Sequence, residues 1–511
     1  MKKSVIYAVL LLATAACTDD LDQYPNTETT SADLYQNVGQ YESVLAKAYA
    51  SFVIAGQEKG GTNADISSNS GHDLLRGLFN LQESCTDELM PTWLDGDNLN
   101  GLTFFSWDAN DPWVSDVYYR LYYTISLCNE FLRQDISSFS ASDVSTLQTY
   151  HAEARFLRAF AYYWVLDLYR KGPLQTEANE VGAYVPQVAD AQGLFDFIES
   201  ELKECSEAML SRADAVYGRA PRAAAWILLS RLYLNAEVYT GVARYSDVIT
   251  YAQKVIDEGY TLAPSYASLF NADNHKRTEE IIFHAVVDAD EVVSWGASTY
   301  TVCGAVSNSS TSESYNSLDY GVKAGWGSFR SRSALPGLFE ATDDRAMFYT
   351  DGQTLEVVTA DNASEGYLVC KWTNLTDDGE VASNTSDDGV DTDWPMFRLP
   401  EAYLNLAEAV VRGGTGATLS DALALVNALR ERSGASAKYE SDISLRFLLD
   451  ERGREFYWEA LRRTDLVRYG MLTSSDYSYD LKPSTVADKY NYFPIPQSEL
   501  TANPNLSNPE Y

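Results

Sequence analysis

Two pairs of apolar segments in this chain repeat one spacing of large and small residues, and this repeat constrains the fold more than any other feature. Apolar positions recur at helical period over residues 219–258, and the same offsets return over residues 400–432. Such spacing is typical of tetratricopeptide helix hairpins, in which small residues stand where two helices touch. The repeated positions are Trp226, Leu229, Ser230, Tyr233, Ala252 and Ile256 in the first pair, and Tyr403, Leu406, Ala407, Val410, Ala422 and Val426 in the second.

The repeat predicts a mainly α protein built on a tetratricopeptide-like helical-repeat scaffold. We expect its apolar stripes to be core and not a cofactor box. Residues 279–287 are rich in β-branched side chains and predict a short strand. The expected scaffold comprises residues of about 41–55, 116–288 and 396–470, the last with helices near 400–412, 418–432 and 444–470.

The rest of the chain is expected to be loops and an extended tail around this scaffold. A chain of 511 residues with 45% hydrophobic residues is long enough for one large domain, which we place at residues 41–511. Gly, Ser, Thr, Asn and Asp dominate residues 289–395, which predicts a loop-rich insertion with minor β structure. The tail, residues 471–511, is predicted to be extended because its last nineteen residues, FPIPQSELTANPNLSNPEY, contain four prolines.

The composition excludes several classes of function. A formal net charge of -35 argues against nucleic acid as a partner, because phosphate binding needs a basic surface. Six cysteines in 511 residues do not make a disulfide scaffold, and four scattered histidines with no paired cysteines do not predict a zinc site. The aromatic content of 13%, with 35 Tyr and 10 Trp, instead favours a binding surface.

The N-terminus predicts export. Residues 1–16, MKKSVIYAVLLLATAA, have a basic start, a short apolar run and small residues before Cys17. Two readings remain, ordinary cleavage of a secreted protein and cleavage with lipidation at Cys17, and a lone cysteine directly after Ala-Ala favours lipidation. Residues 17–40 are then an acidic, turn-rich tether, because TDDLDQYP is a sequence that a packed core would not use.

Residues 451–470, ERGREFYWEALRRTDLVRYG, carry charge at helical spacing and suggest two functions. Glu451, Glu455, Glu459 and Arg462 fall at i, i+4, i+8 and i+11, which predicts one helical face with three carboxylates and a guanidinium. A glycoside hydrolase needs two carboxyl groups about 5 to 10 Å apart, one of them protonated. The surrounding arginines would keep both carboxyls ionised, so we favour structural ion pairs that join the helices.

Other chemistry has weaker support. No GxSxG motif is present, and His151 and His284 on an expected helix and strand are more typical of core positions than of catalytic bases. Residues 95–98 and 379–393 contain oxygen-bearing side chains that a calcium ion could use, but neither segment has EF-hand spacing. We therefore expect no cofactor, with structural calcium unsupported by any motif.

Eight segments, in order along the chain, resemble the SusD/RagB family of outer-membrane lipoproteins. Within the segment 451–470, Gly453 departs from the family pattern, which has a larger residue there. The eight segments are Cys17 with TDDLDQYP, ARFLRAFAYYWVLDLYRKGPL (154–174), GRAPRAAAWILLSRLYLNA (218–236), RTEEIIF (277–283), FRLPEAYLNLAEAVVR (397–412), VNALRERSG (426–434), the segment 451–470 and the C-terminal FPIPQSELTANPNLSNPEY.

This resemblance implies a lipid-anchored protein on the cell surface of the outer membrane. It would sit as a lid on a SusC-type TonB-dependent transporter and capture a nutrient, most often a glycan or oligosaccharide, without catalysis. Three alternatives stay open: capture of peptides by the same fold, a glycoside hydrolase, and a purely structural lid.

Aromatic side chains in two loop regions are the candidate ligand contacts. A pyranose stacks its apolar C–H face on Trp or Tyr, and its hydroxyl groups bond to Asn, Asp and Arg. The aromatic loop 87–115 and the insertion 289–395 contain both kinds of side chain, although any one ring could instead fill the core of its own loop. The candidates are Trp93, Asn98, Trp295, Tyr300, Tyr315 and Trp326, with Trp107 and Arg330 as secondary candidates.

Overall fold

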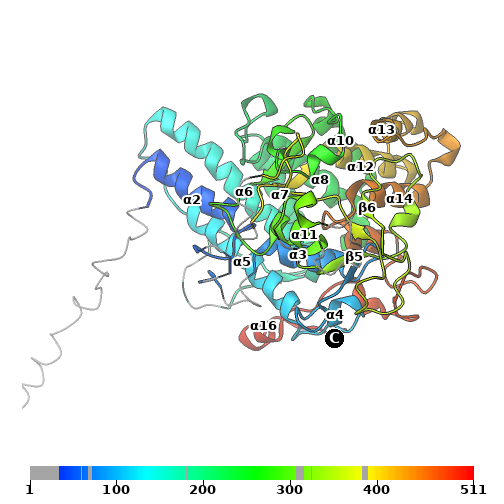
Figure 1. Ribbon diagram of the computed structural model, residues 1–511. Helices are drawn as coiled ribbons and strands as arrows, with labels where there is room; N and C mark the ends of the chain where they lie inside the picture. Colours follow the sequence, from blue (N-terminus) through cyan, green and yellow to red (C-terminus); the bar gives the residue numbers. More distant parts are fainter. Residues whose placement is uncertain are drawn as a thin grey trace, which may run out of the picture.

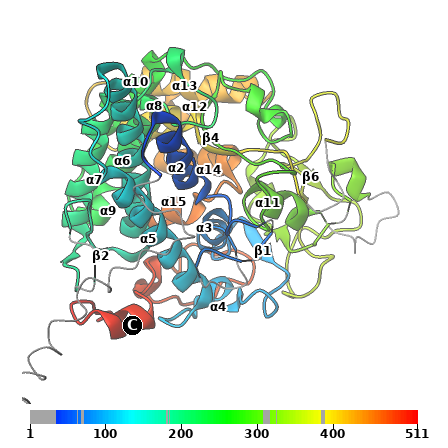
Figure 2. The ribbon, with the colours of Figure 1, turned by 90° about the vertical axis from the view of Figure 1, so that its left-hand side faces the viewer.

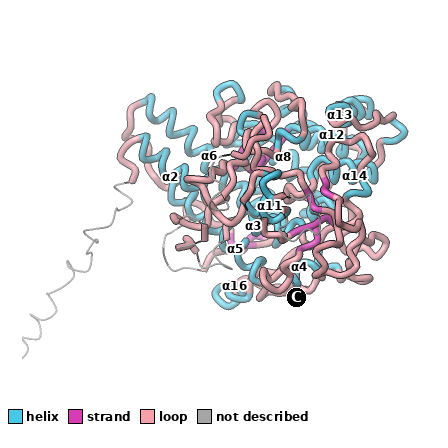
Figure 3. Tube along the Cα trace, viewed as in Figure 1, coloured by secondary structure: helices cyan, strands magenta, loops and turns pink. Residues whose placement is uncertain are grey.

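The computed structural model describes residues 34–58, 60–61, 63–66, 72–179, 182, 185–306, 316–323, 325–382 and 389–511. The predicted signal peptide at 1–16 and Cys17 lie outside the described residues, as do most of the predicted tether and Tyr315. Most of the described chain is helical or loop, with a few short strands (Figure 3). No helix in these ranges is long and apolar enough to cross a lipid bilayer.

The helical half is a row in which each helix packs against the next, as the repeat predicts. Helix α5 packs on α6, α6 on α7, α7 on α8, α8 on α10, α10 on α12 and α12 on α13. Figure 2 shows this row beside the region of α11 (Ala297–Ala305) and β6 (Phe348–Tyr349). The bounds are α2 (Val38–Ala50), α5 (Pro112–Leu132), α6 (Ala141–Tyr169), α7 (Ala191–Ser206), α8 (Arg222–Leu234), α9 (Ala236–Thr240), α10 (Tyr245–Asp257), α12 (Leu399–Val411) and α13 (Leu419–Arg432).

Polar caps determine where several of these helices begin. Asp111 accepts hydrogen bonds from the backbone N–H groups of Trp113 and Val114, so α5 starts at Pro112. Proline suits this first position because its missing N–H has no partner in the helix. The aromatic loop was expected to extend to residue 115, whereas this helix begins at Pro112, four residues before the expected start of the scaffold segment at 116. Thr418 and Asp421 form a capping box at the start of α13.

Four two-stranded antiparallel sheets connect distant parts of the described chain. The predicted strand at 279–287 is present as β4, paired with β8 from the end of the insertion. The pairing of β1 with β5 brings the aromatic loop to the insertion. The strands are β1 (Leu89–Pro91), β2 (Gly172–Pro173), β3 (Val188–Ala189), β4 (Ile281–Ala285), β5 (Phe329–Ser331), β6 (Phe348–Tyr349), β7 (Leu368–Val369) and β8 (Trp394–Arg398).

Helix α3 (Leu74–Glu83) lies at the centre of the molecule and was not predicted. All ten of its residues are buried, and it contacts α5 and α15 (Arg462–Arg468) of the scaffold and α11 of the insertion. Figure 1 shows α3 and α11 side by side in front of the helical row. Its polar side chains therefore face protein on every side, and α3 joins the scaffold to the loop regions.

One other prediction of secondary structure was wrong, and two short helices were not predicted. The single helix at 444–470 is two helices, α14 (Leu445–Phe456) and α15 (Arg462–Arg468), because Trp458 and Ala460 have φ of +59° and break the helical path. The insertion contains a buried helix, α11 (Ala297–Ala305). The tail contains α16 (Gln497–Ala502), which starts directly after Pro496.

Candidate functional site

Arg76 of α3 holds the aromatic loop and the insertion together. Its Nη1 donates a hydrogen bond to the carbonyl oxygen of Trp295 at 2.6 Å, and its Nη2 lies 2.9 Å from Oδ2 of Asp97. The guanidinium also stacks over the ring of Tyr300, 4.0 Å from its centroid. Because Arg76 is 5% exposed, this cation is removed from water and depends on these partners. Trp295 and Asp97 belong to the two segments in which we expected ligand contacts.

Asp73 fixes the segment around Trp295 from the start of α3. Its carboxylate caps the helix by accepting from the N–H of Arg76 and also accepts from the hydroxyl of Ser294. A Cβ on Gly296 would lie 1.8 Å from Oδ2 of Asp73, so only glycine fits beside this carboxylate. The residues on both sides of Trp295 are thereby held by one buried side chain.

The β1–β5 pairing sets Trp93 beside the segment of Trp326. The N–H of Thr92 donates to the carbonyl of Ser328 at 2.8 Å, which extends the pairing one residue past Pro91. Trp93 is the next residue outward on one segment, and Gly327 and then Trp326 follow on the other. The N–H of Trp326 donates to the carbonyl of Cys303 at 2.7 Å, so α11 supports this segment from below.

The three described tryptophan candidates keep ring surface available. Trp93 is 39% exposed and Trp295 is 45% exposed, while Trp326 is half-buried against Tyr300, with 6.3 Å between ring centroids. Exposed indole surface of this kind can stack on a pyranose. We refer to Trp93, Trp295 and Trp326 together as the tryptophan platform.

Asn98 lies on the turn that follows Trp93 and is exposed. The N–H of Asp97 donates to the carbonyl of Trp93, which closes the turn, and Asn98 has φ of +55°. Asparagine tolerates this left-handed conformation better than most residues. The turn therefore presents an amide near an exposed indole, the pairing of side chains that a sugar hydroxyl and its C–H face require.

Tyr300 was expected to contact ligand, and the structure places it elsewhere. Its side chain is 0% exposed on α11, and its hydroxyl lies 3.0 Å from Oδ1 of Asn80 and 3.2 Å from Oδ2 of Asp97. Neither ring face is open to a ligand, so Tyr300 supports the platform and does not belong to its surface. Burial raises the pKa of this phenol well above its ordinary value, and the hydroxyl stays protonated.

The two secondary candidates are also interior residues. Trp107 is 2% exposed, and its indole N–H donates to the hydroxyl of Tyr511 at 2.9 Å, so it secures the C-terminal tail. Arg330 is 1% exposed and donates to Oγ1 of Thr92 and to the carbonyl of Ala360. Both were selected by residue type alone, which does not separate a loop's core from its surface.

The charged residues of 451–462 form buried ion pairs, which confirms the structural interpretation. Glu455 lies within 3.0 Å of arginine nitrogens of Arg345, Arg398 and Arg432, and its side chain is 0% exposed. Burial alone would raise the pKa of Glu455, but the three guanidinium groups outweigh it and hold the pKa far below its usual range. Glu451 is equally buried and paired with Arg345, Arg430 and Arg454. Neither carboxyl has the exposure or the proton that a glycosidase acid needs.

The break between α14 and α15 means that the expected single helical face was wrong. The charged residues on both sides of the break still join distant parts of the chain. Glu459 follows the break but still shares Arg398 with Glu455, whereas Arg462 pairs with Asp87, 2.7 Å away and 375 residues distant in sequence. Gly453 packs against Leu338 and Arg462, because a Cβ there would lie 2.8 Å from Cδ1 of Leu338 and 3.0 Å from Nη1 of Arg462. The departure of Gly453 from the family pattern therefore has a packing cause.

The carboxylates of Asp95 and Asp97 in the acidic turn at residues 95–98 already have partners within the protein, which disfavours a calcium site there. The carboxylate of Asp97 is committed to Arg76, and that of Asp95 accepts from the amide of Asn100. Part of the second candidate segment, residues 383–388, lies outside the described residues. Across the described ranges no three His, Cys, Asp or Glu side chains are grouped to hold a metal ion.

Sequence reasoning missed Asp73 and Arg76, the residues that organise the platform. The available signal was Asp73 directly before the apolar run LLRGLF, because Asp at that position is a strong helix cap. The pairing of Arg76 with Trp295 had no signal, since 219 residues separate the two.

Comparisons of the sequence with known proteins identify relatives that match nearly the whole chain. A sequence model of the SusD family matches residues 258–511. The starch-binding protein SusD of Bacteroides thetaiotaomicron is 32% identical over an alignment of 565 residues that covers 99% of this chain and 98% of that protein. SusD-like protein P25 of Formosa agariphila is 23% identical and covers 98% of this chain and 97% of its own length.

Solved structures share the fold at lower identity. Surface glycan-binding protein A from Bacteroides thetaiotaomicron in complex with laminarihexaose superposes with a TM-score of 0.71 at 19% identity and covers 93% of this chain and 99% of that one. A SusD superfamily protein from Parabacteroides distasonis superposes with a TM-score of 0.72 at 20% identity, over 95% of this chain and all of that one. These similarities extend over nearly the whole chain.

Proposed function

This chain belongs to the SusD family, and on that premise we propose that it is a glycan-binding protein whose tryptophan platform stacks on sugar rings. The observation that carries the proposal is the platform itself. Two exposed indoles and one half-buried indole come from two distant segments, and buried side chains of α3 hold both segments in place. A surface of this construction loses little entropy when it binds, because its rings are already positioned.

The ligand class follows from the chemistry of the platform. Indole faces suit the apolar side of a pyranose, and the exposed Asn98 beside Trp93 suits a hydroxyl group. The relative with 32% identity is named for starch binding, and a structural neighbour holds laminarihexaose. A glucan is therefore the first ligand to test, with amylose and laminarin oligosaccharides as probes in isothermal titration calorimetry.

The proposal places the protein on the cell surface as a lipid-anchored lid of a SusC-type TonB-dependent transporter. Its support is the export signal before Cys17, the family resemblance and the acidic net charge of -35. Binding without chemistry is part of the proposal, and the commitment of Glu451 and Glu455 to arginines supports it. A purely structural lid would be favoured if alanine at Trp93 and at Trp326 left glycan uptake unaltered while deletion of the gene abolished it.

A further inference from the structure

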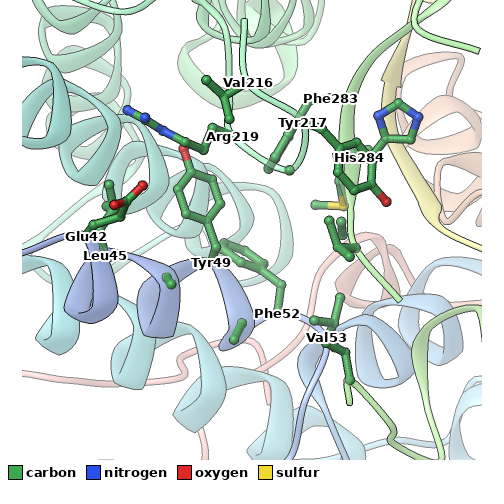
Figure 4. A pocket seen from close by; sticks show the side chains of 17 residues that line it. Glu42, Leu45, Tyr49, Phe52, Val53, Val216, Tyr217, Arg219, Phe283 and His284 are labelled. Atoms are coloured by element: carbon green, nitrogen blue, oxygen red, sulfur yellow. The ribbon is translucent and has the colours of Figure 1, made fainter. Parts of the chain in front are cut away.

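A cavity of about 410 Å³ lies between helix α2, residues 216–219 and strand β4, and it is separate from the tryptophan platform. Its volume falls within the range of about 300–1,000 Å³ that is usual for small-molecule sites. Figure 4 shows side chains of α2 facing Val216 and Tyr217 across the cavity. The residues that line it include none of the platform tryptophans, so its chemistry can be considered by itself.

Direct contacts between the loop 216–219 and the β4 segment close one wall of the cavity. A Cβ on Gly218 would lie 3.0 Å from Cγ2 of Val286, and the ring centroids of Tyr217 and His284 are 5.7 Å apart. Met396 of the neighbouring strand β8 also lines the space. Because a helix, a loop and both strands of one sheet contribute to its walls, the cavity is a pocket suited to a small molecule.

Four Tyr and Phe side chains contribute to the lining of the pocket. Tyr49 of α2 is half-buried and Tyr217 on the opposite wall is 51% exposed, while Phe52 and Phe283 are buried. The face of an aromatic ring carries negative electrostatic potential and attracts a cation placed over it. Clusters of such rings recognise alkylated ammonium groups in other proteins. This lining therefore suits a cation with an apolar body.

Glu42 determines the charge at the α2 end of the pocket, where it is exposed. Arg219 is the only Lys or Arg among the described lining residues, and its Nε donates to Oε2 of Glu153 at 3.0 Å, so its charge is already compensated. Burial lowers the pKa of His284 to about 4, which keeps this ring neutral at pH 7. The wall therefore has a net negative charge, which attracts a cation and repels an anion.

The two tyrosine hydroxyl groups of the wall already have partners. That of Tyr49 donates to Oε2 of Glu153 at 2.7 Å, and that of Tyr217 donates to Oδ2 of Asp393. The many hydroxyl groups of a sugar would lose water on entering this space and find few free partners to replace it. The ligand that fits the pocket is therefore largely apolar.

We propose that the pocket between α2, residues 216–219 and β4 binds a small organic cation, in which an ammonium group is attached to an apolar body. The ammonium group lies near Glu42 and the tyrosine rings, and the apolar body packs against the buried side chains of the lining, which include Leu45 and Val53. This site is independent of glycan binding, since it uses neither the residues nor the chemistry of the platform.

The test compares two probes that differ only in a cationic nitrogen in place of a carbon, meta-hydroxyphenyl-trimethylammonium and meta-tert-butylphenol. Isothermal titration of the mature chain at about pH 6.5, where both phenols keep their proton, measures the two affinities. We expect the ammonium probe to bind at least about tenfold more tightly, because only the cation is attracted by the rings and by Glu42. Equal affinity of the two probes, or absence of binding by the ammonium probe, would overturn the proposal.

Glu42→Gln tests the contribution of charge. Because Glu42 is exposed, the substitution is expected to leave the fold intact and to weaken binding of the ammonium probe about threefold, with no change for meta-tert-butylphenol. Glu440→Gln, a change at an exposed carboxylate outside the pocket, is the matched control. An unchanged affinity of Glu42→Gln for the ammonium probe would contradict the proposed orientation of the ligand.

A cavity-filling variant locates the site. Ala46 is exposed and lines the pocket, so Ala46→Trp is expected to weaken binding of the ammonium probe at least about tenfold, whereas Ser43→Trp on the exposed side of α2 should have no effect. Thermal unfolding of both variants verifies that α2 still packs. The parent's affinity in Ala46→Trp would contradict the proposal, and so would displacement of the probe by maltoheptaose, which would place the probe at the platform.

Discussion

Arg76 Nη1 donates to the carbonyl oxygen of Trp295 at 2.6 Å and so links the central helix to the most exposed indole of the platform. The same guanidinium pairs with Asp97 in the loop of Trp93. One buried cation thus joins the two segments that carry Trp295 and Trp93, which are far apart in sequence. The proposed ligand surface depends on this buried contact.

Replacing Arg76 with methionine should weaken glycan binding and stability together. Methionine keeps much of the side chain's volume but leaves Asp97 buried without its cation, a change that costs about 3–5 kcal/mol when a buried pair is broken. Urea unfolding and calorimetry measure the two effects. Arg133→Met removes a half-exposed pair with Glu130 and is the matched control, for which we expect a loss below about 1 kcal/mol. Full glycan affinity in a folded Arg76→Met chain would show that the platform does not need this anchor.

Alanine at Trp295 or at Trp93 should reduce glycan affinity without unfolding the protein. Truncation of a ring at the centre of a binding surface costs about 2 kcal/mol or more, which corresponds to roughly 30-fold in affinity. Both side chains are more than one-third exposed, so the folded state loses little apolar contact. Tyr439→Ala is the control, because Tyr439 is 76% exposed and lies on the helical half. An equal effect of the control would remove the distinction between these rings and any surface aromatic.

Stability should fall as the pH rises, in part because of Glu88. Burial raises the pKa of this carboxyl from 4.5 to about 8, with Asp87 adding to the rise and Arg462 opposing it. The folded chain therefore keeps a proton that the unfolded chain releases above about pH 4.5, and the stabilisation is lost as pH rises toward 8. The slope is at most about 1.4 kcal/mol per pH unit for one group.

Glu88→Gln should flatten this dependence. The amide oxygen of glutamine can still accept the hydrogen bond from the N–H of Trp458, which Oε2 of Glu88 now accepts at 3.2 Å. Chemical unfolding at pH 5.5, 7 and 8.5 compares the variant with the parent and with Glu440→Gln, a change at an exposed carboxylate. The same pH slope in Glu88→Gln and the parent would contradict a proton held by Glu88 in the folded chain.

Glu455→Gln should destabilise the fold and leave carbohydrate chemistry unchanged. The variant removes the negative charge that three buried arginines share, and a loss of about 3–5 kcal/mol is expected. The measurement is urea unfolding beside a reducing-sugar assay on amylose and laminarin. Hydrolysis by the parent chain that disappears in a folded Glu455→Gln variant would revive the glycosidase alternative.

Cys17→Ala should release the protein from the membrane fraction. Lipidation needs the cysteine thiol, and two or more acyl chains are required for stable anchoring. Fractionation of cells followed by immunoblotting compares the variant with the parent, and Cys370→Ala serves as the control. Retention of Cys17→Ala in the membrane fraction would refute lipidation at this residue.

Local patterns were sufficient for the helical half. The spacing around Trp226 and Tyr403 reports contacts between neighbouring helices, which are close in sequence, so α8, α10, α12 and α13 could be predicted. The break at Trp458 and Ala460 could not, since neither residue favours positive φ and tertiary contacts impose it. The N–H of Trp458 bonds to Glu88, 370 residues away, which gives one such contact.

The loop regions with exposed tryptophans could be predicted from the sequence, but the burial of each aromatic residue could not. Loop composition pointed to the segments of Trp93, Trp295 and Trp326, and all three keep exposed ring surface. Composition could not distinguish Tyr300, which packs under the platform, from the exposed tryptophans. A buried and an exposed aromatic residue look the same in a sequence. The distinction arises from α3, whose side chains meet the insertion only in the folded chain.

The most direct test of glycan binding by the platform is isothermal titration of the mature chain with maltoheptaose and laminarihexaose, repeated with Trp93→Ala and Trp295→Ala. The account predicts saturable binding of at least one oligosaccharide by the parent chain and a loss of roughly 30-fold or more in each variant. Binding that both variants retain at the parent's affinity would contradict it, because the sugar would then lie elsewhere on the molecule.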